Sequence, residues 1–290
     1  MKQFLFVLAI IGALSFTQKS KKFKGPENYV FIPSGAIEME GEKYSCAAFW
    51  MSKHEVTNYE YRQFLKSLKD ANRMDEYKTA LPDTLEWSKI GGYMDQMANM
   101  YFWHPAYNNY PVVNVSKEGA EMYCQYVTEQ YRTMYGNVIQ NFRLPTQKEW
   151  MYAAASGKDN MRYAWDGLST RDADGRFRAN YFPIGDQNIQ RTDEGILIVP
   201  DSLIRVDIVA DNGFATVDCT AKGRSYAPNE FGLYNICGNV AELVADKDVA
   251  MGGHWQSMGY DIRIQSSEVF NSPNPFTGFR PVLTFIKQDN

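Results

Sequence analysis

The sequence predicts an irregular α/β (α+β) fold with little regular secondary structure. Three segments carry helix-start signals, strand-like segments are few and short, and long loops rich in Gly, Asp and Asn fill the rest. Loops this long are uncommon inside a compact domain unless something organises them. We therefore expect a single domain over residues 26–290, with loops ordered by a metal, a disulfide or a ligand.

Three helices are expected from their first turns. Each begins at a hydroxyl side chain that can cap the helix, and two of these are followed by a glutamate that completes a capping box. These starts are Thr57 with Glu60, Ser116, and Thr146 with Glu149. The second helix should stop at Gly136, and the third should cover Trp150–Ala155 and end near Gly157.

Short runs of β-branched and aromatic residues predict the strands. These runs are Tyr29–Pro33, Ala47–Met51, Ile196–Val199, Ile204–Val209 and Pro281–Phe285. We find no internal repeat and no low-complexity tract, which favours one domain.

The composition is that of an ordinary globular protein. Of 290 residues, 44% are hydrophobic and 22% charged, with a net charge of −4. Nucleic-acid binding needs a basic surface to meet phosphates, and this weakly acidic chain offers no such patch. We expect no nucleic-acid partner.

The N-terminus has the pattern of a secretory signal peptide, assigned to residues 1–17. A basic start is followed by the apolar run Phe4–Phe16, which is too short to span a bilayer. The alternative is an N-terminal anchor that is left uncleaved. No cysteine follows the run, so the usual bacterial lipid-attachment signal is absent. We expect an exported protein, in the periplasm, the cell envelope or the extracellular space, with no transmembrane span in its mature form.

The four cysteines, Cys46, Cys124, Cys219 and Cys237, lie far apart, without the C-x-x-C spacing of zinc or redox sites. In an oxidising compartment they can form up to two disulfides, with three possible connectivities. Buried free thiols are the alternative, because Cys124 and Cys237 lie in apolar local patterns.

Several motifs occur in order along the chain: Met51–Tyr59 (MSKHEVTNY), Phe142–Ala155 (FRLPTQKEWMYAAA), Asn229–Glu242 (NEFGLYNICGNVAE), Gly252-Gly253 and Gly278-Phe279-Arg280. Together they resemble the formylglycine-generating enzyme family, also called the sulfatase-modifying factor family. The resemblance implies that family's irregular fold, which is distantly related to C-type lectins. The segments Leu81–Trp87, Tyr101–Pro105 and Asn109–Pro111 resemble its Bacteroidetes branch, which includes lipoproteins of gliding motility and type IX secretion.

The resemblance implies structural calcium. One site maps to Asn235, Gly238, Val240 and Glu242, which supply the hard oxygen ligands that calcium prefers. A weaker second site maps to Asn180, Tyr181, Asn212 and Phe214, where Asn212 replaces the family's usual Asp. The alternative at both places is a hydrogen-bonded turn without a metal.

The resemblance also implies where catalysis is missing. The family's oxidase chemistry is similar to copper chemistry on two cysteine thiolates, soft ligands that suit Cu(I). Aligning the Gly252-Gly253 pair places Ser257 and Ile262 at the two cysteine positions. Neither side chain can supply a thiolate, so we expect no catalytic residue of the known kind, no bound copper and no formylglycine formation.

A possible ligand cleft is expected around His254, Trp255, Ser257 and Tyr260, which flank the former active site. Aromatic-lined clefts bind peptides or sugars well, although these aromatics can equally fill a core. The leading hypothesis is a binding or envelope-assembly module whose partner is a peptide, a glycan or an envelope protein. The competing hypothesis is a metal-dependent oxidoreductase or protein-modifying enzyme with different chemistry in the same cleft, using His254.

Overall fold

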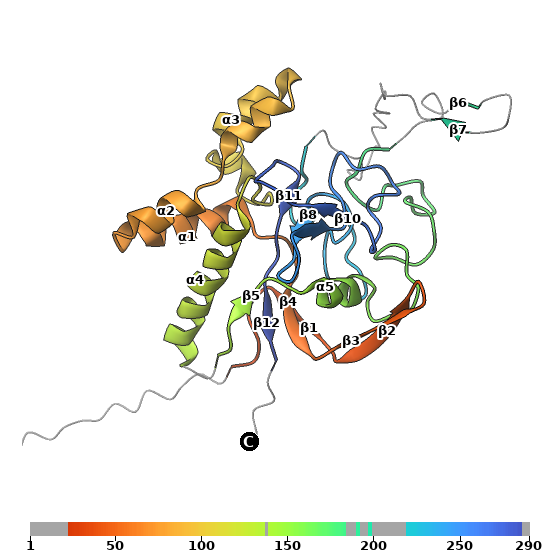
Figure 1. Ribbon diagram of the computed structural model, residues 1–290, viewed down its shortest axis with the longest axis horizontal. Coiled ribbons are helices and arrows are strands. Elements are labelled where there is room, and N and C mark those ends of the chain that lie inside the picture. The colour runs from red at the N-terminus through yellow and green to blue at the C-terminus, as the bar shows by residue number, and fades with distance from the viewer. Residues whose placement is uncertain (1–22, 137–138, 184–189, 192–196, 199–218, 286–290) are drawn as a thin grey trace, which may run out of the picture.

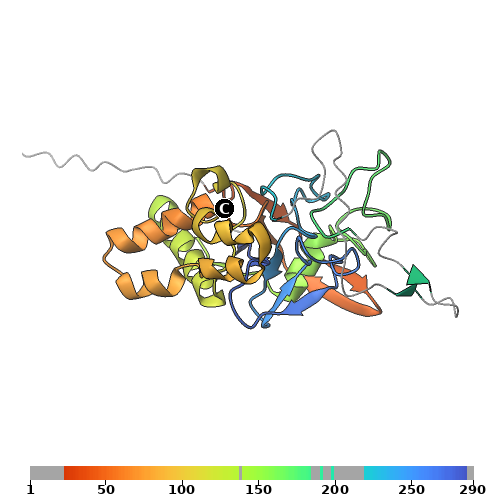
Figure 2. The same cartoon turned by 90° about the horizontal axis from the view of Figure 1, so that it is seen from above.

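The computed structural model describes residues 23–136, 139–183, 190–191, 197–198 and 219–285. Its helical segments between residues 58 and 135 gather on one side, and short strands joined by long loops lie on the other (Figures 1 and 2). The predicted mixed fold with little regular secondary structure is therefore confirmed. The predicted signal peptide, residues 1–17, lies outside the described residues.

Two small four-stranded sheets organise the described chain. The first has the order β1-β4-β12-β5, with the strands Tyr29–Ile32, Phe49–Ser52, Val282–Thr284 and Phe142–Arg143. The second has the order β10-β9-β8-β11, with the strands Ser267–Val269, Val249–Met251, Ala241–Leu243 and Thr277–Gly278. Because only three residues, Phe279, Arg280 and Pro281, separate β11 from β12, this short segment joins the two sheets.

The three predicted helices are present as α1 (Asn58–Asp70), α4 (Lys117–Tyr135) and α5 (Gln147–Ala154). Thr57 and Thr146 form the capping boxes expected from the sequence. Gly136 ends α4 at φ 81°, a left-handed conformation that glycine adopts readily. No helix in the described part of the chain is long and apolar enough to cross a membrane.

The segment between α1 and α4 is more helical than the sequence predicted. It forms α2 (Met74–Ala80), α3 (Met97–Met100) and the 3₁₀ helices η1 (Thr84–Lys89), η2 (Gly92–Gln96) and η3 (Pro105–Tyr107). Trp87, Tyr101 and Phe102 are buried, so most of the aromatic residues here fill a core, whereas Trp103 is half exposed. Single turns of helix are too short for an apolar period to reveal them.

Three predicted strands appear, with shifted ends, as β1, β4 and β12. The predicted strand Ile196–Val199 contains the two-residue strand β7 (Leu197–Ile198), which pairs with β6 (Gln190–Arg191). The fifth, Ile204–Val209, lies outside the described residues. A hairpin of β2 (Gly35–Met39) and β3 (Glu42–Cys46) was not predicted. Its signal was present, since Ile37 and Met39 are buried alternately before a turn at Glu40-Gly41 in which both residues have positive φ.

Helix α5 connects the fold to the candidate site. Its Trp150 is fully buried in a cluster with Ile236 and Met251, so α5 shares one core with the segment around β8 and β9. The glycine that follows β9, Gly252, lies so close to Trp150 that an added Cβ would be 2.9 Å from the indole. This close packing fixes Trp150 against the second sheet.

Candidate functional site

A buried ion pair lies at the centre of the molecule. Glu242 on β8 and Arg280, just before β12, are both fully buried and 2.5 Å apart at their closest atoms. Arg280 Nε donates to both carboxylate oxygens, at 2.9 and 2.8 Å, and Trp150 Nε1 donates to Oε2 at 2.8 Å. Arg280 also donates to the carbonyls of Ser52 and Tyr234, at 3.1 and 2.8 Å. The pair therefore joins α5 and both sheets.

A second buried carboxylate, Glu55, lies in the same region. Asn239 Nδ2 donates to Glu55 Oε1 at 2.7 Å, and Asn235 Nδ2 lies 3.4 Å from Oε2. Burial raises the pKa of Glu55 to about 7, with Arg280 opposing the rise and Glu242 adding to it. Only Glu242 pairs directly with Arg280, so Glu55 carries a carboxyl group into the low-dielectric interior without a paired cation, where ionisation is costly.

The turn that carries Asn235 and Asn239 is strongly constrained. Asn235, Gly238 and Asn239 all have positive φ, at 51°, 74° and 67°. A Cβ on Gly238 would lie 2.4 Å from the carbonyl oxygen of Asn180, and the same oxygen accepts from Asn239 N at 2.7 Å. Only glycine fits at position 238, because the backbone of a distant segment passes there.

The four residues mapped to the first calcium site lie on or beside this turn, and they fit a cation only in part. Asn235 Oδ1 is buried without a hydrogen-bond donor, as an oxygen awaiting a cation would be. Glu242 differs, because each of its carboxylate oxygens already accepts two hydrogen bonds, from Arg280 and Trp150. With this pairing intact, its carboxylate has no lone pair left for a metal.

At the second mapped site, Asn180 and Tyr181 are buried side by side on one segment. Asn180 Nδ2 donates to the carbonyl of Cys219 at 2.7 Å, and the Tyr181 hydroxyl bonds to Thr170 Oγ1 at 2.7 Å. Asn212 and Phe214 lie outside the described residues.

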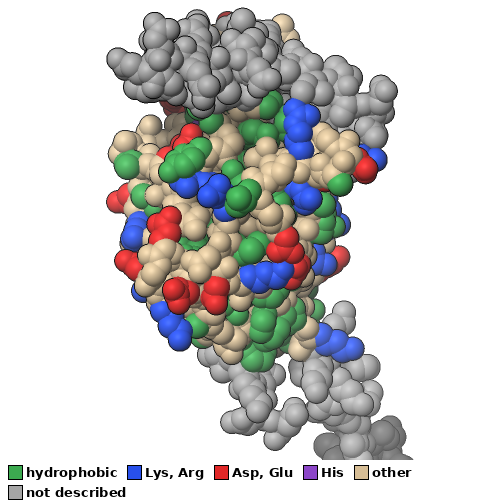
Figure 3. Space-filling view, turned by 90° about the vertical axis from the view of Figure 1, so that its right-hand side faces the viewer, with side chains coloured by type: hydrophobic (Ala, Val, Ile, Leu, Met, Phe, Trp, Pro, Cys, Tyr) green, Lys and Arg blue, Asp and Glu red, His purple; other side chains and the backbone are tan. Residues whose placement is uncertain are grey.

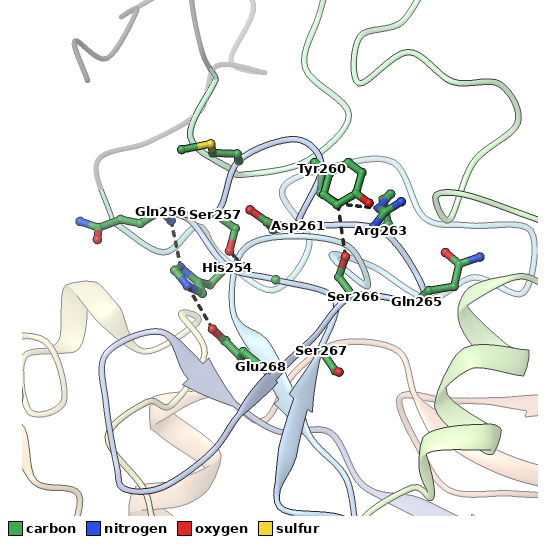
Figure 4. Close-up of a pocket in the computed structure, with 12 residues that line it drawn as sticks. His254, Gln256, Ser257, Tyr260, Asp261, Arg263, Gln265, Ser266, Ser267 and Glu268 are labelled. Atoms are coloured by element: carbon green, nitrogen blue, oxygen red, sulfur yellow. Dashed lines mark hydrogen bonds and ion pairs between the residues drawn. The ribbon is translucent and has the colours of Figure 1, made fainter. Parts of the chain in front are cut away.

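The predicted cleft corresponds to a pocket of about 570 Å³ lined by residues 253–268 (Figure 4). His254, Ser257 and Tyr260 are among its lining residues. Trp255 does not, which corrects the prediction: it is buried, and its Nε1 donates to the carbonyl of Pro275 at 3.2 Å. The Trp255 ring instead packs against Phe276, with 5.4 Å between the ring centroids.

Hydrogen bonds fix the orientation of the His254 ring in the pocket (Figure 4). Its Nδ1 accepts from the backbone N–H of Gln256 at 3.1 Å, so the neutral ring carries its proton on Nε2, 3.5 Å from Glu268 Oε2. The Ser257 hydroxyl instead accepts from the backbone N–H of His254 at 2.9 Å. His254 and Ser257 are therefore not arranged as a base and its nucleophile.

The two positions aligned with the family's cysteines differ in their surroundings. Ser257 lines the pocket, whereas Ile262 is fully buried and is not among the residues that line it. None of the four cysteines forms a disulfide, and Cys46, Cys124 and Cys237 are buried, which decides against the disulfide alternative left open by the sequence. Burial raises the pKa of Cys46 to about 11 and that of Cys237 to about 12, and it also raises the pKa of Cys124.

The histidines do not form a cluster. His54 Nδ1 bonds to the carbonyl of Glu55 at 2.9 Å, and His104 caps η3 through the N–H of Ala106. Among the described residues, no group of three or more His, Cys, Asp or Glu side chains is placed to hold a metal ion.

The sequence did not single out Glu55, Arg280 or Glu268. Glu55 lies in the motif MSKHEVTNY and Arg280 in the motif GFR, and both motifs carry the family resemblance. The sequence therefore contained both residues in recognised motifs, but it did not show which side chains they contact. Glu268 carries no local signal, because only the packing of β10 beside β9 brings it to His254.

Comparisons with known proteins agree with this architecture. The family described as "Sulfatase-modifying factor enzyme 1-like domain" matches residues 15–285. A formylglycine-generating enzyme of Thermomonospora curvata is 33% identical over 138 residues, 48% of this chain and 34% of the relative. An inactive C-alpha-formylglycine-generating enzyme 2 of Bos taurus is 22% identical over 82% of this chain and 74% of the relative.

The solved structure of PvdO from Pseudomonas aeruginosa has a similar fold, with a TM-score of 0.55 at 14% identity, over 89% of this chain and 94% of that one. This likeness concerns the fold alone. The match to the first relative spans about a third of that protein's length. The chain belongs to the sulfatase-modifying factor family, because the family match covers nearly all of it.

Proposed function

We propose that this protein is a family member without cysteine-dependent oxidase activity that binds a ligand in the His254 cleft. The observation that carries the proposal is the lining of the cleft: none of its twelve described lining residues is a cysteine. Burial keeps three of the four thiols protonated, whereas a copper-binding thiol must be ionised. The match to a relative named as inactive supports the same reading.

The cleft contains strong hydrogen-bond acceptors. Asp261 and Glu268 provide carboxylates, and Glu268 Oε1 is buried without a donor. Arg263 is already engaged, because its Nε donates to the carbonyl of Tyr260 at 2.7 Å and its guanidinium lies 3.3 Å from the Tyr260 ring centroid. A ligand rich in donors, such as a glycan or an amine-bearing peptide, suits this lining.

The biological setting that we propose is the cell envelope. Support comes from the signal-peptide pattern and from the insertion that resembles the Bacteroidetes branch, with its gliding-motility and type IX secretion proteins. An envelope protein, or a peptide or glycan displayed there, is then the partner. On the face drawn in Figure 3, acidic and basic side chains are interspersed, which suits such a partner better than nucleic acid.

An oxidase assay tests the proposal. The purified protein, loaded with copper and incubated with a cysteine-containing sulfatase peptide, is expected to form no formylglycine by mass spectrometry. The Thermomonospora curvata enzyme serves as the positive control. Ser257→Cys should also remain inactive, because the second position is a buried isoleucine. Formylglycine produced by the unmodified protein would overturn the proposal.

The second candidate is an enzyme with different chemistry in the same cleft. It is favoured by His254, whose proton-bearing Nε2 faces Glu268 beside the pocket. The test is stoichiometric binding of a redox-active transition metal. If His254→Ala loses this binding and the control His104→Ala, which removes the side chain that caps η3, keeps it, the enzyme is favoured over the binding module.

We further propose structural calcium at the turn of Asn235, Gly238, Val240 and Glu242, supported by the unpaired Asn235 Oδ1. Glu242 would join the ligands only by giving up contacts to Arg280. An ion bound only by the folded state stabilises it, so EGTA is expected to lower the melting temperature by several degrees. The melting temperature of Asn235→Ala should no longer fall in EGTA. The control variant Thr57→Ala loses only a helix-capping side chain, so its melting temperature should still fall in EGTA. An unchanged melting temperature in EGTA contradicts the site.

A further inference from the structure

Two adjoining pockets lie away from the His254 cleft, between residues 156–166 and 227–237. The outer one has a volume of about 340 Å³ and the inner one about 60 Å³. They share the lining residues Ala164, Trp165, Arg178, Pro228 and Asn229. None of their lining residues belongs to the His254 cleft, so they form a separate place on the molecule.

Arg178 is the unusual group in these pockets. Its Nε is buried and has no hydrogen-bond partner, and its guanidinium forms no ion pair among the described residues. The other basic side chain there, Lys158, is already paired, since it contacts Asp166 at 3.1 Å and also Glu230. A buried N–H without an acceptor destabilises the folded state, and a ligand oxygen that accepts from it would remove this cost.

The lining around Arg178 includes an aromatic ring and several aliphatic side chains. Trp165 is held by its Nε1, which donates to the carbonyl of Ser169 at 2.8 Å, and it stacks on Tyr163 at 5.0 Å with an interplanar angle of 6°. Pro228 and Ala164 line both pockets, and Leu233 and Ile236 extend the inner one. A fixed aromatic wall beside an unpaired guanidinium suits a ligand with an apolar body and one anionic end.

We propose that these pockets bind a carboxylate-bearing ligand, with the carboxylate on Arg178 and an apolar body against Trp165. Arginine binds carboxylates through two parallel hydrogen bonds, and the inner volume exceeds that of a single water several-fold. Asp166 and Glu230 line the outer pocket, and their charges disfavour a phosphate, which carries more negative charge. The site is independent of the function proposed for the His254 cleft.

A matched pair of probes tests the site on the full chain by titration calorimetry. N-acetylphenylalanine carries the carboxylate, and N-acetylphenylalaninamide differs from it only by losing that charge. The acid is expected to bind at least about tenfold more tightly than the amide, as expected for a charge-assisted hydrogen bond. Arg178→Gln should abolish this preference, and Arg162→Gln, at an exposed arginine outside both pockets, should retain it.

Further arms separate the sources of the carboxylate. Benzoate binding as tightly as N-acetylphenylalanine indicates a site for free acids, and tighter binding of a peptide with a free C-terminal phenylalanine indicates a peptide C-terminus. Arg178→Gln removes no partnered group, so its melting temperature should stay close to that of the unmodified protein. Equal binding of acid and amide, absence of binding, an unchanged Arg178→Gln variant, or displacement of the acid by inorganic phosphate at equal concentration would each overturn the proposal.

Discussion

Replacing Arg280 with methionine is expected to lower the free energy of unfolding by about 3–5 kcal/mol, because it leaves the Glu242 carboxylate buried without its counter-charge. Both side chains are fully inaccessible, and Arg280 donates to two backbone carbonyls besides the carboxylate. Removing it therefore leaves acceptors from β4, β8 and the turn before Asn235 without donors. Urea denaturation followed by tryptophan fluorescence measures the loss.

The matched control for this variant is Lys66→Met, which breaks the exposed pair of Lys66 with Asp70 on α1. The side chains of that pair are 66% and 64% exposed, and such pairs contribute about 1 kcal/mol or less. A loss below 1 kcal/mol for Arg280→Met would show that the buried pair does not hold the two sheets together.

The free energy of unfolding of the unmodified protein is expected to fall as the pH rises, and Glu55→Gln is expected to remove this fall. Burial raises the pKa of Glu55 from 4.5 to about 7, so the folded state holds this proton more tightly than the unfolded chain. The contribution of Glu55 is therefore complete below about pH 4.5 and is lost as the pH rises toward 7. At 1.36 kcal/mol per pKa unit, the loss is at most about 3 kcal/mol.

Unfolding by urea at pH 5 and at pH 7.5 measures this dependence. The difference between the two pH values should shrink in Glu55→Gln and should remain in Glu121→Gln, which alters an exposed residue of α4. Identical pH profiles for Glu55→Gln and the unmodified protein would contradict a strained, buried Glu55.

The helices could be predicted because their signals are local. The capping boxes of α1 and α5 each involve residues three positions apart, Thr57 with Glu60 and Thr146 with Glu149. Between α1 and α4, η1 and η3 also begin at capping side chains, Asp83 and His104, but these turns are too short for the aromatic residues that they bury to show a helical period. The family resemblance was also visible, because it depends on motifs of a few residues each.

The candidate sites could be predicted only in part. Of the four residues proposed for a ligand cleft, His254, Ser257 and Tyr260 line a pocket, whereas Trp255 belongs to the core, because burial along an irregular loop follows no fixed period. Asn235 and Glu242 were recognised together from one motif. The partner of Glu242 was not, because Arg280 is 38 residues further along the chain.

The sequence by itself determined the family, the mixed and irregular fold class, and the starts of the three longest helices. Each of these depends on residues within a short stretch, where backbone geometry and capping act locally. Only the tertiary structure decided that Glu242 pairs with Arg280, that Glu55 lies beside them, and that Arg178 faces a pocket without an acidic partner. Ion pairs and cavities depend on segments far apart in the chain: Glu55 and Asn239, 184 residues apart, meet only in the folded chain.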